Sequence, residues 1–310
     1  MRRMPTANRG MALIGALVVV VLATSAAVAM AERQQVELRR AENLTLGAQA
    51  MRHVQGVETW ALAVLAADAR RNQRDDAGDE WARPLPPTAV PGGEVAGTIE
   101  DLGGRLNLND LIREDEPDPA QVERLRRLLA HLGLNPAMAM AVVDWIDSDL
   151  DTSGPDGAED GYYSRLDPPY RSANRPMAHE GELSFVRGFD PAVLSRLLPH
   201  VCAVPAGSAI NVNLATGPVL ASLGRETEPD VLQSLLAGRP YPTVVDFISA
   251  LVAAGVEGLE ADGLAVTSNH FRVASHVRLG HVSLRVDSDI ERIGGVPRLL
   301  RRQFQGDDDA

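Results

Sequence analysis

Seven carboxylates and no cationic side chain fall within residues 144–163, which read DWIDSDLDTSGPDGAEDGYY. They are Asp144, Asp147, Asp149, Asp151, Asp156, Glu159 and Asp160. So many like charges in a short segment repel one another unless solvent or a cation relieves the repulsion. Hard oxygen ligands in a loop of Gly, Ser and Pro suit Ca²⁺, which takes ~6–8 oxygens in flexible geometry. The segment therefore predicts a calcium site.

The spacing of these acids starts like an EF-hand loop and then departs from it. Asp147, Asp149 and Asp151 occupy alternate positions. However, Thr152 stands where the EF-hand turn requires Gly, and Glu159 comes one residue too late. We therefore expect a different calcium loop. The favoured ligands are Asp147, Asp149, Glu159 and Asp160, with Asp151 and Asp156 as second choices.

Two other interpretations of the acidic segment are open. It could be a solvated loop without a metal, although Tyr162, Tyr163 and the following residues 166–171 suggest a loop packed onto something. A carboxylate pair could also act as an acid and base in hydrolysis. No nucleophile or base stands nearby in the sequence, and the seven histidines show no metal-ligand spacing such as HExxH. Catalysis is therefore the weakest of these interpretations.

The N-terminal region predicts a membrane anchor. Residues 11–31 (MALIGALVVVVLATSAAVAMA) carry no charge, and a helix rising ~1.5 Å per residue over this length crosses a ~30 Å hydrocarbon core. Three arginines before the run favour a cytoplasmic N-terminus. A cleaved signal peptide is the alternative, because residues 27–29 and 29–31 fit a small-x-small cleavage site. The length of the run, and the proline-free helical sequence that follows it, favour a retained anchor.

Composition limits the function classes. The net charge of −12 disfavours contact with nucleic acid or anionic headgroups.

The fragments at 105–109 and 209–215 resemble each other, and the second resembles the opening of a helix-hairpin-helix or SAM-like module. Because residues 224–228 bring more acid than base, we expect a packing module whose Asn side chains hold turns. The single cysteine, Cys202, lies in an apolar context and is expected to be buried.

Hydrophobic periodicity divides the rest of the chain into α and β sections. A long helix should continue through residues 44–65, and residues 83–93, with four prolines, should form a loop. Alternation predicts one hairpin within residues 94–109, turning at Gly103-Gly104, and another within 270–290, turning at Gly280-His281. Between them, helices should start at three N-cap–Pro pairs, with further starts near Pro218, Pro229 and Thr243. The three pairs are Asp118-Pro119, Asn135-Pro136 and Asp190-Pro191.

The N-terminus resembles the leader of the type IV pilin and pseudopilin family, in which a Gly directly precedes the uncharged run. The resemblance implies that a prepilin peptidase cuts between Gly10 and Met11 and leaves the run attached. Most members have Glu at the fifth mature position, thought to neutralise a neighbour's N-terminal amine, but this chain has Gly15. The member lacking that Glu is the K-type minor pseudopilin of type II secretion systems, and residues 144–183 resemble its calcium-binding α-domain.

This resemblance implies an α+β fold in which a pilin-like long N-terminal helix packs on a small antiparallel sheet interrupted by a large inserted helical domain. The expected divisions are a leader (1–10), a transmembrane helix (11–31), a first pilin-like part (32–109), the insertion with the calcium loop (110–265) and a second pilin-like part (266–310). The implied location is the bacterial inner membrane, crossed once, with a periplasmic body.

The implied function is non-enzymatic. The chain would start and then cap the periplasmic pseudopilus of type II secretion. Implied partners are the I- and J-type minor pseudopilins, the prepilin peptidase and the assembly platform, with no nucleic acid. The alternatives are a tip component of a type IV pilus or DNA-uptake system, and a membrane-anchored periplasmic hydrolase. Basic surface on the insertion would favour the first alternative, and a pocket with a perturbed acid/base pair would favour the second.

Overall fold

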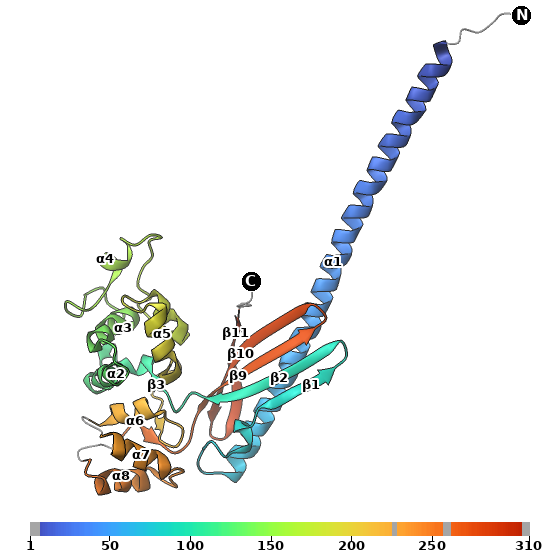
Figure 1. The fold of residues 1–310 in the computed structure, drawn as a ribbon. Helices are drawn as coiled ribbons and strands as arrows, with labels where there is room; N and C mark the ends of the chain where they lie inside the picture. The colour runs from blue at the N-terminus through green and yellow to red at the C-terminus, as the bar shows by residue number, and fades with distance from the viewer. Residues whose placement is uncertain (1–6, 225–227, 257–261, 306–310) are drawn as a thin grey trace, which may run out of the picture.

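The computed structural model describes residues 7–224, 228–256 and 262–305. A single helix, α1 (Ala7–Arg71), runs for 65 residues and projects far beyond the body (Figure 1). Residues 13–39 of this helix are exposed, and its most apolar window is 0% buried within the molecule. Further along, Ala50, Val54, Val57 and Ala61 are buried at spacings of three or four residues, as expected for one helix face on a core. Among the described residues, α1 is the one helix long and apolar enough to span a membrane.

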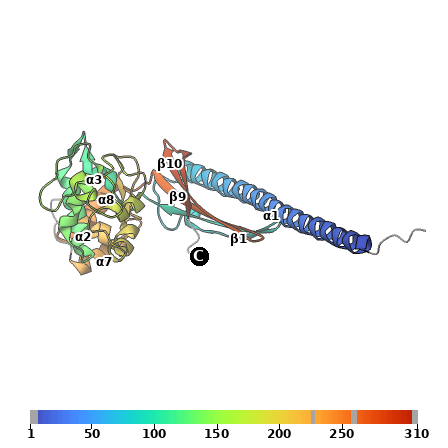
Figure 2. The same ribbon diagram turned by 90° about the horizontal axis from the view of Figure 1, so that it is seen from above.

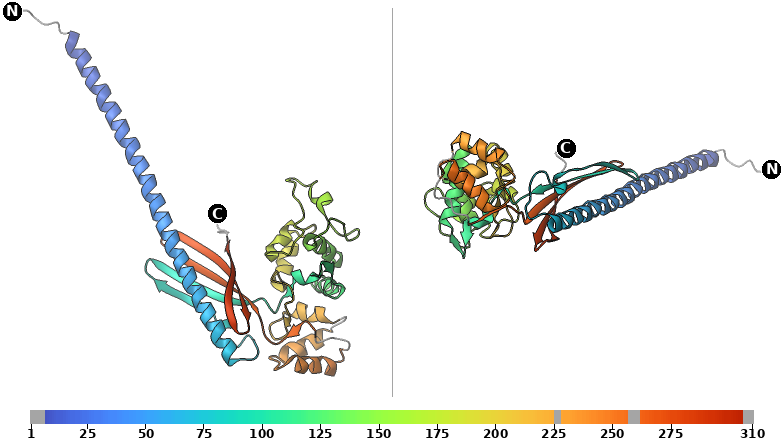
Figure 3. Two further views of the ribbon diagram at one scale, coloured as in Figure 1. Left: turned by 180° about the vertical axis from the view of Figure 1, so that it is seen from behind. Right: turned by 90° about the horizontal axis from the view of Figure 1, so that it is seen from below.

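The C-terminal half of α1 packs on a five-stranded antiparallel sheet of order β1-β2-β9-β10-β11 (Figure 3). The strands are β1 (Leu85–Val90), β2 (Gly93–Asp101), β9 (His270–Leu279), β10 (Val282–Ile293) and β11 (Val296–Gln305). One face of the sheet packs on α1 through the buried side chains of Val95, Ile99, Val273 and Val277. A Cβ on Gly97 would lie 2.6 Å from Val57 Cγ1, so this glycine allows the close approach of helix and strand. The predicted fold class is confirmed.

Several β predictions need correction. Residues 85–90 form a strand rather than a loop, because Pro86 and Pro87 lie on an edge strand where a missing N–H costs no ladder bond. The predicted turn at Gly103-Gly104 is wrong: β2 forms its hairpin with the preceding strand β1, and residues 106–107 (β3) pair parallel with residues 201–202 (β6). The hairpin at 270–290 is confirmed, and β11 adds a further strand after Gly294-Gly295.

The insertion lies between the ends of β2 and β9 and sits beside the sheet, away from the N-terminus of α1 (Figures 1 and 2). Its helices are α2 (Pro119–His131), α3 (Ala139–Ile146), α4 (Asp160–Tyr163), α5 (Pro191–Leu197), α6 (Gly217–Leu223), α7 (Pro229–Ala237) and α8 (Val244–Ala253). Short 3₁₀ turns cover Glu80–Ala82, Leu108–Leu111, Pro136–Met138, Glu180–Phe185 and Leu198–His200. The three predicted N-caps accept backbone N–H groups as expected, and Asn135 caps the 3₁₀ turn before α3.

The insertion contains two similar modules. Each opens with a short strand and an Asn-x-Asn turn: β3 (Leu106–Asn107) in the first and β7 (Ile210–Asn211) in the second. Each strand pairs parallel with one at the module's end, β6 (Val201–Cys202) and β8 (Leu264–Ala265). The remaining short pair is β4 (Ile112–Arg113) with β5 (Glu116–Pro117). Leu106 and Leu108 pack in the insertion core, so the insertion begins slightly earlier in space than residue 110.

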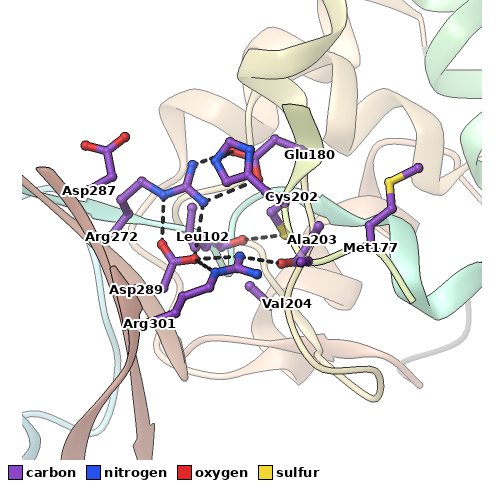
Figure 4. Close-up of polar contacts among 12 residues, drawn as sticks. Leu102, Met177, Glu180, Cys202, Ala203, Val204, Arg272, Asp287, Asp289 and Arg301 are labelled. Carbon is purple, nitrogen blue, oxygen red and sulfur yellow. Dashed lines mark hydrogen bonds and ion pairs between the residues drawn. The ribbon is translucent and has the colours of Figure 1, made fainter. Parts of the chain in front are cut away.

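A buried ion-pair cluster joins the insertion to the sheet (Figure 4). On β9, Arg272 Nε donates to Asp289 Oδ1 of β10 at 2.8 Å, and its guanidinium pairs with Glu180 of the insertion. Arg301 of β11 donates to Asp289 Oδ2 at 2.7 Å and to the carbonyl of Ala203 at 3.0 Å. Burial opposes ionisation, but the arginine contacts hold the pKa values of Glu180 and Asp289 below their ordinary range.

A second buried network surrounds Arg292 near the end of α1. Its guanidinium donates to Asp68 at 3.1 Å, to Asp75 Oδ1 at 2.6 Å and to the carbonyl of Ser268 at 2.9 Å. It also lies over the Phe271 ring, 4.7 Å from the centroid. The network therefore ties together α1, the sheet and the C-terminal end of the insertion.

Candidate metal centre

The acidic loop connects α3 to α4. Asp147 is the C-cap of α3, and Glu159 is the N-cap of α4, so the two helix ends hold both residues in place. Asp147, Asp149 and Glu159 each offer an oxygen atom, and these three atoms lie within 4.8 Å of one another. Three of the four favoured ligands are thus brought together.

No Lys or Arg of the described ranges forms an ion pair with this group of three carboxylates. Asp147 and Glu159 are each 4% exposed. Asp147 Oδ1 and Glu159 Oε1 are buried and accept no hydrogen bond from the described residues. Burial, followed by repulsion from Asp149, Asp144 and Glu159, raises the pKa of Asp147 to about 7. Burial also raises the pKa of Glu159. Buried, unpaired carboxylate oxygens facing one another fit a hard divalent cation.

The other predicted ligands lie around this group. Asp160 Oδ1 accepts the backbone N–H of Ser172 at 3.0 Å. Asp151 and Asp156 are exposed and outside the group. Asp144 is fully buried and accepts the N–H of Ser153 at 3.0 Å.

Two further residues shape the site, and sequence reasoning did not identify them as functional. Asn174 Nδ2 donates to the carbonyl of Asp149 at 2.6 Å, and its Oδ1 is a further buried oxygen that accepts no hydrogen bond within the described part of the chain. Its φ of +44° lies in the left-handed region, which Asn tolerates better than most residues. Gly157 is required because a Cβ there would lie 2.1 Å from Asp144 Oδ2.

An aromatic cluster supports the loop. Trp145 of α3 meets Tyr163 of α4 edge to face at 5.3 Å between ring centroids, and Tyr163 stacks on Tyr170 at 5.3 Å. Tyr163 is fully buried, and its hydroxyl accepts the N–H of Arg187 at 3.2 Å. The loop is therefore packed onto the insertion core, as the tyrosines in the sequence suggest.

The other residues considered in the sequence analysis lie outside the acidic loop. Cys202 is buried, and burial raises the pKa of its thiol well above its ordinary range. The Asn-x-Asn turns hold local backbone as predicted, since Asn107 and Asn211 each accept the N–H two residues ahead. Residues 225–227 of the acidic stretch next to α6 lie outside the described residues. Gly10, Met11 and Gly15 all lie within α1, while residues 1–6 of the expected leader lie outside the described residues.

Comparison with known proteins relates the two modules and the whole fold to proteins of bacterial secretion. Two family models described as "Type II secretion system (T2SS), protein K" match residues 104–206 and 210–267, one for each module.

Whole-length relatives carry the same description. The chain is 36% identical to type II secretion system protein K of Pseudomonas aeruginosa, over 88% of this chain and 85% of that protein. It is also 36% identical to the Aeromonas hydrophila protein of that name, over 98% and 99% of the two chains. In the crystal structure of the GspK-GspI-GspJ complex from enterotoxigenic Escherichia coli, one chain superposes with a TM-score of 0.76 at 26% identity, covering 86% of this chain and 99% of that one.

Proposed function

Because the chain belongs to the type II secretion system protein K family, we propose that it is a non-enzymatic minor pseudopilin that starts and caps the tip of the periplasmic pseudopilus. The observation that carries this proposal is the large helical insertion between β2 and β9 of a pilin-like sheet. The buried acids that pair with Arg272 and Arg292 join elements of the fold, and we propose no catalytic role for them.

The position at the tip follows from charge and shape. A repeating subunit must receive its neighbour's N-terminal amine within an apolar helix bundle, where an unpaired charge is costly. Gly15 offers no carboxylate for that amine. The insertion beside the sheet would also obstruct stacking at every repeat (Figure 1). The subunit is therefore suited to the end of a filament.

The apolar helix α1 is compatible with a single-pass membrane anchor. We further propose that it crosses the bacterial inner membrane with its N-terminus in the cytoplasm and the sheet and insertion in the periplasm. Three arginines before the apolar run support this orientation. Before assembly, a prepilin peptidase would cut between Gly10 and Met11.

N-terminal sequencing of the membrane-extracted protein is therefore expected to begin at Met11. Gly10 directly precedes the uncharged run, and the run should remain attached because it anchors the body. Gly10→Ala serves as the control and should leave the leader uncut. A mature protein beginning at Ala29, Ala31 or Glu32 would instead mean an ordinary signal peptide and would contradict the pseudopilin proposal.

The proposed partners are the I- and J-type minor pseudopilins and the assembly platform. A related chain was crystallised in a complex with GspI and GspJ, which supports the first two. We expect the full chain, extracted in mild detergent, to co-purify with co-expressed I- and J-type subunits and not with the major pseudopilin alone. Immunogold labelling should place it at filament ends. Labelling along the whole filament, or no capture of either minor subunit, would contradict the proposal.

We also propose that the acidic loop binds Ca²⁺ as a structural ion. Asp147, Asp149 and Glu159 would hold it, and the buried amide oxygen of Asn174 and the carboxylate of Asp160 are further candidate ligands. The support is the set of buried oxygens around that loop that accept no hydrogen bond from the described residues. The ion would neutralise the repulsion among these carboxylates and join the ends of α3 and α4.

A further inference from the structure

The two modules of the insertion differ in how they satisfy one turn. In the first module, Asn107 accepts the N–H of Val204 at 3.1 Å and donates to the carbonyl of Pro205 at 3.2 Å. Both partners lie just after β6, so the first module closes this turn with its own side chain. The register of the short strands makes Asn211 the counterpart of Asn107, and Ser268 the counterpart of Pro205.

The second module closes the same turn with residues from other parts of the chain. Asn211 donates to the hydroxyl of Ser268 at 2.8 Å, but the backbone of Ser268 bonds to groups outside the module. Its N–H donates to Asp75 Oδ2 at 2.7 Å, and its carbonyl accepts from Arg292 at 2.9 Å. Asp75 lies in the linker between α1 and β1, residues 72–84, and stands 193 positions before Ser268 in the sequence.

The linker also meets the second module through its backbone. Asp75 N donates to the carbonyl of Val266 at 2.8 Å, and the carbonyl of Asp75 accepts from Asn211 Nδ2 at 3.1 Å. This one residue therefore contacts both β7, through Asn211, and the segment that follows β8. Asp75 is 1% exposed. Since a buried polar group that loses its partner is costly, these bonds hold the linker firmly on the second module.

The same linker residue is tied closely to α1. Arg292 donates to Asp75 at 2.6 Å and to Asp68 of α1 at 3.1 Å. Three residues separate Asp75 from Arg71, where α1 ends, so this part of the linker has little slack. Figure 3 shows that α1 ends beside the second module, which contains α6, α7 and α8. The contacts of Asp75 therefore connect the end of the long helix directly to the insertion.

We infer that the linker after α1 is a strap that fixes the insertion to the end of α1, so that the two move as one body, whether or not the chain caps a pseudopilus. The difference between the modules carries this inference, because the first closes its turn internally and the second closes it with Asp75. A tilt of α1 at its anchored end would then reach the second module through Asp75 without a hinge.

The test measures a distance across this joint by double electron–electron resonance, on the full chain in mild detergent. Spin labels are attached at Thr59→Cys on α1 and Ser249→Cys on α8, which are exposed positions, whereas the native Cys202 is buried. We expect Asp75→Ala to broaden the distance distribution by about two-fold or more, because it releases the second module from the strap. Asp76→Ala is the control and should leave the width unchanged, since the side-chain bonds of Asp76 stay within the linker.

A second pair of variants decides the question if Asp75→Ala does not fold. Asn211→Ala removes a bond to the linker and leaves every bond of Arg292 in place, and Asn107→Ala is the matched change in the first module. We expect only Asn211→Ala to broaden the distribution. An unchanged width in folded Asp75→Ala and Asn211→Ala protein would overturn the inference. Equal broadening by Asn107→Ala and Asn211→Ala would also overturn it, because it would show a general loosening of the insertion.

Discussion

Replacing Arg292 with Met is expected to lower the free energy of unfolding by about 3–5 kcal/mol, the usual cost of removing one partner from a buried ion pair. Asp68 and Asp75 would lose their guanidinium partner while only 6% and 1% exposed. Burial, together with repulsion from Asp79 and Asp75, already raises the pKa of Asp68 to about 6 even with the arginine present. Without Arg292, the charged form of the Asp68 carboxyl would be disfavoured further.

Urea unfolding of the full chain, followed by tryptophan fluorescence, measures this effect. Trp81 packs edge to face on Phe271 at 5.2 Å, in the same cluster as Arg292, and so reports the unfolding of the sheet. Arg278→Met is the matched control, because Arg278 pairs with Glu94 at the surface. The side chain of Arg278 is 60% exposed and that of Glu94 is 41% exposed. The control should cost at most about 1 kcal/mol. Equal midpoints for both variants would show that the Arg292 network contributes little to stability.

Calcium is expected to raise the melting temperature of the metal-free protein, and chelator should reverse the change. An ion that binds only the folded state stabilises it by about 3–4 kcal/mol at 100 to 1,000 times its dissociation constant. The Asp147→Asn and Glu159→Gln variants should respond far less, because each removes a charge from the group of three. Asp156→Asn, at an exposed acid outside the group, should respond like the wild type.

A second measurement separates a metal site from an acidic loop without metal. In the absence of calcium, Asp147→Asn should raise the melting temperature, because it relieves the burial and repulsion that raise the pKa of that carboxyl. In saturating calcium, the same substitution should place the variant below the wild type. A melting curve of the wild type that does not change between calcium and chelator, in protein verified as metal-free, would leave only a packed acidic loop without metal.

The sequence predicts the elements with strong local signals. The long helix, the hairpin at 270–290 and the Asp-Pro and Asn-Pro helix starts follow from periodicity and capping. The strand at 85–90 could not be predicted in this way, since its prolines are acceptable only at an edge that the tertiary fold defines. β11 lacks a clear alternation because Arg301 and Arg302 point to opposite faces, each toward a buried acid on another segment.

The candidate site is predictable in part for the same reason. Composition identifies the acidic segment, but not which acids face one another. The ends of α3 and α4 bring Asp147 and Glu159 together, and the loop leaves Asp151 exposed. Asn174 comes from a later segment of the chain, and hydrogen bonds to the carbonyls of Trp145 and Asp149 hold it at the loop. Sequence spacing does not encode these contacts.

The position of the insertion between two neighbouring strands affects how the sheet is built during folding. Leu102 N donates to the carbonyl of His270 at 3.0 Å, so the insertion's two ends meet. An unfolded connection of ~170 residues makes pairing β2 with β9 about 3 kcal/mol harder than a four-residue loop would. A folded insertion removes most of that entropy cost, because it already holds the two strand ends together. The central strand pair should therefore form after the insertion, which would act as the nucleus for the pilin-like half of the chain.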